Sequence, residues 1–190
     1  PHAGLIYSGP VAGAVFSAIE FPETFVLLGP NHTGLGSQIS LMESGQWEIP
    51  TGTFEIDEKI AYKVAMNVPF VTKDGRGHMF EHSLEVQLPF ISCFSGNAKI
   101  VPISILTATL DECRLLGEGI AKAVKDAGYS VVLVASSDMT HYESQEEAGK
   151  KDKQAISAIL ELNEDSLFER IKEFDISMCG YAPSIAMISA

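Results

Sequence analysis

Two short runs of consecutive apolar residues constrain the fold of this chain most. Residues 25–28 are Phe, Val, Leu and Leu, and residues 131–135 are Val, Val, Leu, Val and Ala. A continuous apolar run of about four to eight residues is typical of a strand that is covered on both faces. Such strands occur in parallel sheets with helices on either side. We therefore predict that both runs lie inside a largely parallel sheet.

The rest of the chain alternates between further strand and helix patterns. Strands are predicted at residues 38–42 and 100–106, and helices at 11–19, 57–66, 111–127, 147–162 and 166–174, with others running on from His82 and from Tyr181. This alternation favours one α/β domain over residues 1–190, with a mostly parallel or mixed sheet flanked by helices. The sequence opens without Met and stops inside a predicted helix, so we expect both termini to be truncated.

Composition narrows the possible partners and the compartment. The 13 basic and 25 acidic residues give a net charge of −12, which disfavours nucleic acid and anionic membrane surfaces as partners. No apolar run approaches the roughly 20 residues that span a bilayer. The three cysteines, Cys93, Cys113 and Cys179, have no close spacing, which favours a reducing cytoplasm over a disulfide framework. An unidentified small molecule or peptide remains the expected partner, and the sequence does not indicate the oligomeric state.

Each apolar run leads into a polar loop that contains histidine. The first is followed by Asn31 and His32, and the second by Asp138 and His141. In open α/β sheets, ligands bind beyond the carboxyl ends of the strands. If the two strands are neighbours, His32 and His141 can converge there. The histidine at position 78 lies in a glycine-containing loop and is expected on the surface.

These residue types favour a metal site, although each also has an ordinary structural explanation. Two histidines and one anionic ligand with open positions describe a non-haem iron site, and Cys179 could supply the anion as a thiolate. Thiolate ligation would also suit zinc or copper. Taken singly, a loop histidine is more often a hydrogen-bonding residue, Cys179 a small buried apolar residue, and Asp138 a helix cap. Spacing alone leaves both interpretations open.

Five ordered blocks resemble the motifs of the Memo family. They are Pro-His-Ala-Gly at residues 1–4 with Tyr-Ser-Gly at 7–9, Gly-Pro-Asn-His at 29–32, Glu-His-Ser-Leu-Glu-Val-Gln-Leu-Pro-Phe at 81–90, Ser-Ser-Asp-Met-Thr-His-Tyr at 136–142, and Cys-Gly with Pro at 179–183. The block at 81–90 is the most specific. Together the blocks span essentially the whole chain, so the sequence is identified as similar to Memo proteins.

The resemblance implies a fold like the LigB-type catalytic subunit of class III extradiol dioxygenases. Those enzymes hold Fe(II) with two histidines and a glutamate and use another histidine as an acid/base. The resemblance assigns metal binding to His2, His32 and Cys179. It assigns catalytic roles to His141, as the acid/base, and to Asp138, which supports the same pocket. The cleft around these residues would include Asn31, Glu81 and His82.

Two functions from different classes follow from this resemblance. The first is a Memo-family protein with a non-haem metal pocket and redox or dioxygenase-like activity on an unknown substrate. Fe(II) is the expected metal, with copper or zinc as alternatives, and turnover stays open because Cys179 stands where the dioxygenases have a carboxylate. The second is a non-catalytic module that binds a peptide or an anionic ligand in the same cleft, with Trp47 as the candidate aromatic at its mouth. A metal-assisted hydrolase is the weakest alternative, because no Gly-x-Ser-x-Gly motif is present.

Overall fold

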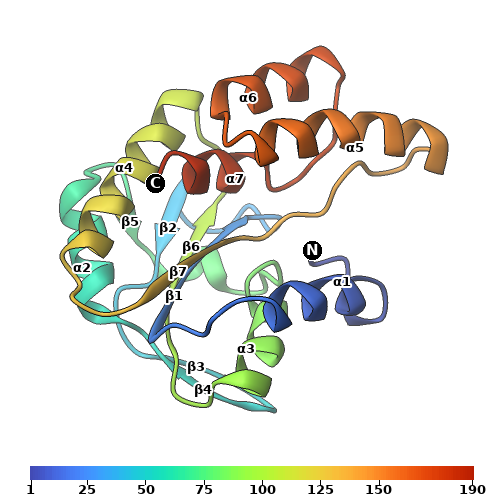
Figure 1. The fold of residues 1–190 in the computed structure, drawn as a ribbon. Helices are drawn as coiled ribbons and strands as arrows, with labels where there is room; N and C mark the ends of the chain where they lie inside the picture. The colour runs from blue at the N-terminus through green and yellow to red at the C-terminus, as the bar shows by residue number, and fades with distance from the viewer.

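A five-stranded sheet forms the centre of the computed structural model, which describes all of residues 1–190 (Figure 1). Three strands, β6, β1 and β7, run parallel, whereas β2 is antiparallel to β6 and parallel to β5. The order across the sheet is β5 (Thr72–Lys73), β2 (Ile39–Leu41), β6 (Lys99–Ile105), β1 (Thr24–Pro30) and β7 (Val131–Ala135). The predicted α/β class, with a mixed and mostly parallel sheet flanked by helices, is confirmed.

Helices cover both faces of this sheet. Figure 1 shows α2, α4 and α7 on one face and α1 with α3 on the other, while α5 and α6 pack together beyond α7. The helices are α1 (Leu5–Ser17), α2 (Glu58–Asn67), α3 (Leu88–Phe94), α4 (Leu110–Lys125), α5 (Gln145–Leu160), α6 (Glu164–Glu173) and α7 (Tyr181–Ile188). None of the helices is long and apolar enough to cross a membrane.

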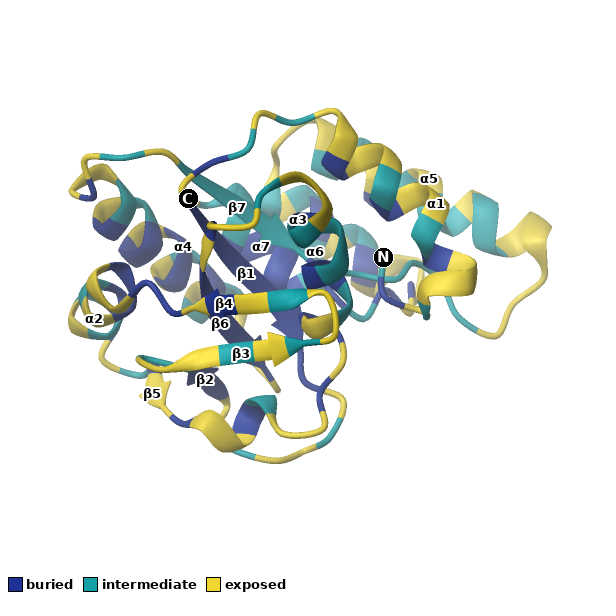
Figure 2. Cartoon of the chain, turned by 90° about the horizontal axis from the view of Figure 1, so that it is seen from below, coloured by how far each residue is buried: buried dark blue, intermediate teal, exposed yellow.

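Strand register places the two histidine loops next to each other. Strand β1 lies between β6 and β7, and all seven of its residues are buried, which is the dark blue centre of Figure 2. Leu28 of β1 pairs with Ala135 of β7, and the backbone N–H of Ser136 donates to the Leu28 carbonyl, which continues the ladder. The loops that follow both strands therefore leave the same edge of the sheet, as the sequence predicts for neighbouring parallel strands.

Several helices begin where a side chain caps their first backbone N–H groups. Thr109 and Glu112 form a capping box at α4, and the side chains of Ser144 and Asn163 cap α5 and α6. Asp57 caps α2, because its side chain accepts a hydrogen bond from the N–H of Ile60.

Two predicted helix starts are wrong. Helix α1 begins at Leu5 rather than at residue 11, and Pro10 lies inside it. Its first turn begins at Gly4, whose carbonyl accepts from the N–H groups of Tyr7 and Ser8, and the helix continues through Pro10, which has no N–H to donate. The helix expected to run on from His82 is replaced by a 3-10 turn, Glu85–Gln87, and α3 starts only at Leu88.

Three further features differ from expectation. Strand β7 is partly rather than fully buried, because β1 is its only neighbour in the sheet. The hairpin of β3 (Gln46–Ile49) and β4 (Gly52–Glu55) was not predicted; its strands are short and mostly exposed (Figure 2). His78, expected on the surface, has both ring nitrogens buried, and burial lowers its pKa to about 4. Its ring packs 5.5 Å from that of Trp47.

Candidate metal centre

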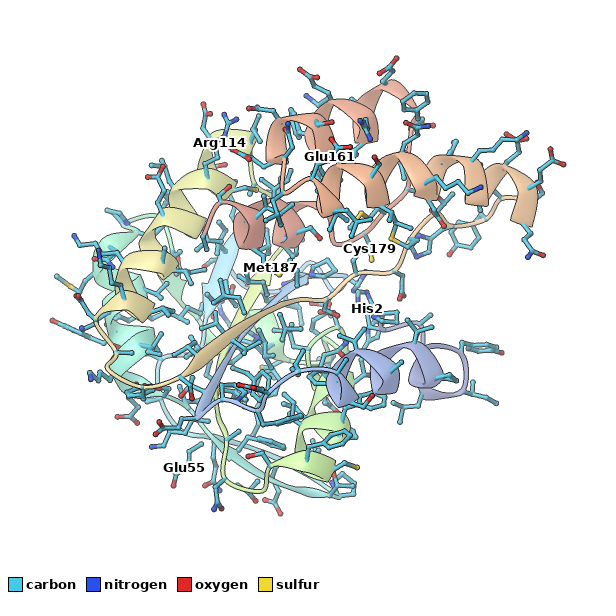
Figure 3. The ribbon with its side chains drawn as sticks, in the orientation of Figure 1. His2, Glu55, Arg114, Glu161, Cys179 and Met187 are labelled. Carbon is cyan, nitrogen blue, oxygen red and sulfur yellow. The ribbon has the colours of Figure 1, made fainter.

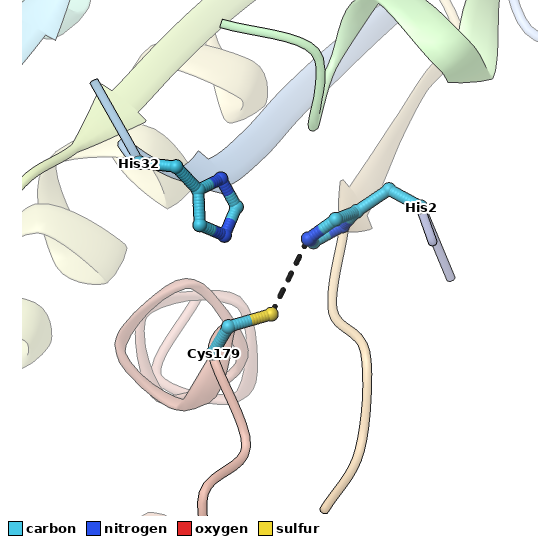
Figure 4. Close-up of side chains that lie close together, drawn as sticks. All are labelled: His2, His32 and Cys179. Carbon is cyan, nitrogen blue, oxygen red and sulfur yellow. Dashed lines mark hydrogen bonds between the residues drawn. The ribbon is translucent and has the colours of Figure 1, made fainter. Parts of the chain in front are cut away.

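Three predicted metal ligands lie together at the carboxyl end of the sheet. Ligand atoms of His2, His32 and Cys179 all lie within 4.8 Å of one another (Figure 4). The Sγ atom of Cys179 is 3.3 Å from Nε2 of His2. His2 precedes α1, His32 follows β1, and Cys179 directly precedes the Gly180 cap of α7, so three distant segments converge (Figure 3). The other two cysteines take no part, because Cys93 is exposed on α3 and Cys113 is buried within α4.

Glu81 orients the ring of His32. Its carboxylate accepts from the backbone N–H of His32, and its Oε1 lies 3.0 Å from His32 Nδ1 and 2.9 Å from the N–H of Ser83. Burial alone would raise the pKa of Glu81, but the hydrogen bonds from His32 and Ser83 outweigh it and lower the pKa to about 2. A carboxylate only accepts hydrogen bonds, so His32 donates from Nδ1 and keeps the Nε2 lone pair free.

His2 is almost fully buried and its backbone is fixed by Asp138. The Oδ1 atom of Asp138 accepts from the backbone N–H groups of His2 and Ala3 at 2.6 and 3.1 Å. Burial lowers the pKa of His2 to about 4, and the nearby His32 and His82 lower it further against the opposing charge of Asp138. The ring is therefore neutral at physiological pH, which is the form that binds metal ions.

Cys179 sits between the Asp138 backbone and the His2 ring. The N–H of Asp138 donates to Cys179 Sγ at 3.2 Å. Burial raises the pKa of this thiol, and the charge of Asp138 raises it further. Hydrogen bonds from the Asp138 N–H and the Ser137 side chain lower the pKa but do not outweigh these effects. The next residue must be glycine, because a Cβ on Gly180 would lie 2.3 Å from the Ser136 carbonyl oxygen. This close approach keeps Cys179 beside the end of β7.

His141 approaches the same thiol from the second loop. A ligand atom of His141 lies within 4.8 Å of Cys179 and Asp138. Its Nδ1 is 2.8 Å from the carbonyl oxygen of Ser177, and its backbone N–H donates to Ser177 Oγ at 2.7 Å. Because a carbonyl only accepts, the Nδ1 atom carries a proton and Nε2 is free to accept one.

The remaining predicted cleft residues have different positions. The ring of His82 stacks on that of His32 with centroids 5.1 Å apart and lies edge-on to His2 at 5.5 Å, so it borders the site. Asn31 instead faces its own loop. Its Oδ1 accepts from the N–H groups of Thr33 and Gly34, and its Nδ2 donates to the carbonyl of Leu35. Asn31 therefore shapes the loop that carries His32.

Trp47 does not belong to this site. Its Nε1–H donates to Met42 Sδ, and with His78 these residues line a separate cavity of about 240 Å³ beside the β3–β4 hairpin.

The sequence did not predict two residues that hydrogen-bond the histidine rings on the side away from the cluster. They are Ser136, at Nδ1 of His2, and Ser177, at Nδ1 of His141. Ser136 falls inside a family-like block, which was the one available signal, whereas Ser177 falls outside every block.

Comparison with known proteins identifies the family. The family model described as Memo-like protein matches residues 1–190. The chain belongs to the Memo-like family. A MEMO1 family protein of Pyrobaculum aerophilum is 45% identical over 193 residues, which cover 100% of this chain and 69% of that protein. MEMO1 family proteins of Methanococcus maripaludis and Methanocaldococcus jannaschii are both 43% identical, again with 100% of this chain and 69% of each relative covered.

The structure brings together the residues to which the resemblance assigns metal binding. The resemblance to Memo proteins is confirmed, and the α/β architecture is consistent with the LigB-like fold that it implies. The donor set also fits a metal ion. Ligands about 2.0–2.3 Å from one ion lie roughly 3–4 Å apart, close to the separations found here. Each candidate imidazole has a hydrogen-bond partner on its Nδ1 side, as metal-binding histidines usually have.

Proposed function

We propose that this Memo-like protein binds a non-haem Fe(II) ion through His2, His32 and Cys179 and uses it in redox, dioxygenase-like chemistry on a small molecule. One observation carries the proposal: two imidazoles and a thiol from three distant segments meet within 4.8 Å. Two histidines with one anionic ligand leave positions open for substrate. A bound iron would supply electron transfer and polarise a substrate oxygen.

The side chains around the ligands have separate roles in this proposal. His141 accepts a proton from the substrate at Nε2, because its Nδ1 is held by the Ser177 carbonyl. Asp138 holds His2 in place, because its Oδ1 accepts hydrogen bonds from the backbone N–H groups of His2 and Ala3. Glu81 does the same for His32.

The test is the metal content of protein purified and loaded without oxygen. Anaerobic handling matters because a thiolate beside iron is readily oxidised. Wild type is expected to hold close to one Fe(II) per chain by mass spectrometry, and Cys179→Ser is expected to lose it. Cys93→Ser is the matched control, because Cys93 is an exposed thiol on α3. Parallel loading with zinc and copper ranks the metals, since thiolate ligation suits both. No bound metal in wild type, or equal loss in both variants, would refute the proposal.

A second candidate is a binding cleft without turnover, and two exposed aromatics favour it. Phe80 directly precedes the Glu81 block and is 84% exposed, and Tyr142 directly follows His141 and is fully exposed. Both have positive φ angles, 63° and 59°, which bulky residues rarely adopt and which occur more often at functional sites than elsewhere. Together with the imidazoles, these rings could contact a peptide or an anionic ligand.

Binding of a phosphorylated peptide to metal-free protein distinguishes this candidate. Phe80→Ala and Tyr142→Ala should each weaken such binding, whereas Cys179→Ser should leave it unchanged. Leu160→Ala, which removes another exposed apolar side chain at the end of α5, is the control. Equal peptide affinity of wild type and all four variants would exclude a peptide contact at this cleft.

A further inference from the structure

We propose that Ser136 and Gln87 set the tautomer of His2, keeping its proton on Nδ1 and its lone pair on Nε2. The consequence for metal affinity rests on the function proposed above, whereas the tautomer itself does not. Nε2 is the atom that faces Cys179 at 3.3 Å. If it carried the proton instead, His2 could not bind a metal ion from that side.

The contact between His2 and Ser136 is ambiguous when taken by itself. His2 Nδ1 lies 2.8 Å from Ser136 Oγ. A hydroxyl can either donate or accept, so this contact permits both tautomers. The partners of the other two imidazoles are a carboxylate at His32 and a carbonyl at His141, and both of these only accept. His2 alone needs further residues to decide its tautomer.

The Ser83 carbonyl removes the ambiguity. Ser136 Oγ lies 2.7 Å from this oxygen, which has no proton to give. The single hydroxyl proton of Ser136 must point there, because otherwise two oxygen lone pairs would face each other at hydrogen-bond distance. With that proton used, Ser136 can only accept from His2. The proton between them therefore belongs to His2 Nδ1.

Gln87 supports the same assignment. Its Nε2 lies 3.2 Å from the carbonyl of Pro1, 3.3 Å from that of Ser83 and 3.0 Å from Ser136 Oγ. Two carbonyl neighbours identify this atom as the amide NH₂ group, which can only donate. Gln87 thus occupies one lone pair of Ser136 and directs the hydroxyl proton towards Ser83. This gives a role to the glutamine inside the block at residues 81–90.

Burial makes this arrangement stable. Ser136, Gln87 and the Ser83 side chain are all buried. Ser136 is also fixed by its backbone, because its N–H continues the sheet ladder to Leu28. A hydroxyl that cannot exchange partners with bulk water keeps one orientation, since any other would leave a buried group unpaired. The His2 tautomer is therefore set before a metal arrives.

Nitrogen-15 NMR of the histidine rings in metal-free protein tests the tautomer directly. The His2 signals are assigned by their loss in His2→Ala. Wild type is expected to show a protonated Nδ1 and an unprotonated Nε2 at neutral pH. Ser136→Ala removes the acceptor and should give a mixture of tautomers. A protonated Nε2 in wild type would overturn the proposal.

Anaerobic Fe(II) titration of the same proteins measures the consequence. Loss of a partner that orients a metal-binding histidine typically weakens metal binding about 10- to 100-fold, and Ser136→Ala should fall in this range. Gln87→Met, which removes the donor but keeps a similar volume, should shift the tautomer in the same direction with a smaller loss of affinity. Gln87→Met also tests the proposal if Ser136→Ala does not fold.

Ser40→Ala is the matched control. It removes a buried hydroxyl that donates to the Ser37 carbonyl and takes no part in the histidine cluster. It should retain the wild-type tautomer and affinity. Wild-type behaviour of both Ser136→Ala and Gln87→Met would refute the proposal. If wild type binds no Fe(II), the proposed function fails, while the NMR result still decides the tautomer.

Discussion

The two ends of the central sheet both hold buried or half-buried carboxylates, but their surroundings differ. At the amino end, Asp57 accepts hydrogen bonds from the Thr24 hydroxyl at 2.7 Å, the Tyr129 hydroxyl at 2.6 Å and the N–H of Ile60 at 3.1 Å. At the carboxyl end, Glu81 and Asp138 bind histidine rings and histidine backbone. The groups of the first cluster are hydrogen-bonded to one another, whereas in the second cluster ring nitrogens and a thiol face one another.

The large cavity of this protein lies away from the cluster of candidate metal ligands. A cavity of about 920 Å³ opens at the amino end and is lined by residues that include Asp57, Lys59 and Tyr129. Lys59 Nζ donates to the Ala127 carbonyl and lies over the Tyr129 ring. The polar groups of Asp57, Lys59 and Tyr129 already have partners, so these residues hold the fold together. The free lone pairs lie at the opposite end of the sheet.

Removing the amino-end carboxylate should have the largest effect on stability. Asp57→Ala deletes a helix cap and leaves the hydroxyls of Thr24 and Tyr129 without their acceptor, which together should cost about 3 kcal/mol of unfolding free energy. Chemical denaturation measures this loss. Asp126→Ala, at an exposed carboxylate, should change stability by less than about 0.5 kcal/mol. If Asp57→Ala weakened metal binding as well, the two ends would not be independent.

Removing a carboxyl-end carboxylate should instead affect metal binding. Glu81→Gln takes away the charge that orients His32, and we expect Fe(II) affinity to fall about 10-fold or more in an anaerobic titration. Glu85→Gln is the control, because Glu85 is exposed and lies four residues further along the same block. Equal affinities in the two variants would remove Glu81 from the site.

The contribution of Asp57 at the amino end to stability should depend on pH. Burial would raise the pKa of Asp57, but the hydrogen bonds from Tyr129, Thr24 and Ile60 lower it below 3.8. A lowered folded-state pKa means that the charged form favours folding. Its contribution is therefore complete above pH 3.8 and is lost as the pH falls through the folded-state value. The difference in unfolding free energy between wild type and Asp57→Asn should shrink over that range, and a constant difference would contradict the assignment.

The smallest effect is expected at His82. Its ring borders the cluster, but the three proposed ligands do not include it. His82→Ala should leave the Fe(II) content of the protein close to that of wild type by mass spectrometry. A complete loss of metal would instead make His82 a ligand and enlarge the site.

Much of the fold and of the site could be predicted from local sequence. The apolar runs identified β1 and β7, and the polar loops after them supplied His32 and His141. The start of helix α1 was misplaced because its first turn begins at Gly4, two residues after the buried His2, and no local pattern indicates this start. His78 was misplaced for a similar reason, since its burial depends on contact with Trp47 of the hairpin.

Local sequence was enough to identify the strands β1, β2, β6 and β7, the polar loops that follow β1 and β7, and the residue types that can hold a metal, because these features depend on neighbours along the chain. Which atoms face the site depends on the packing of distant segments. The Nδ1 side of each imidazole is bound by a residue from a different segment: Ser136 for His2, Glu81 for His32 and Ser177 for His141. A hydrogen bond depends on distance and direction in space, and sequence spacing records neither for residues 36 to 134 positions apart.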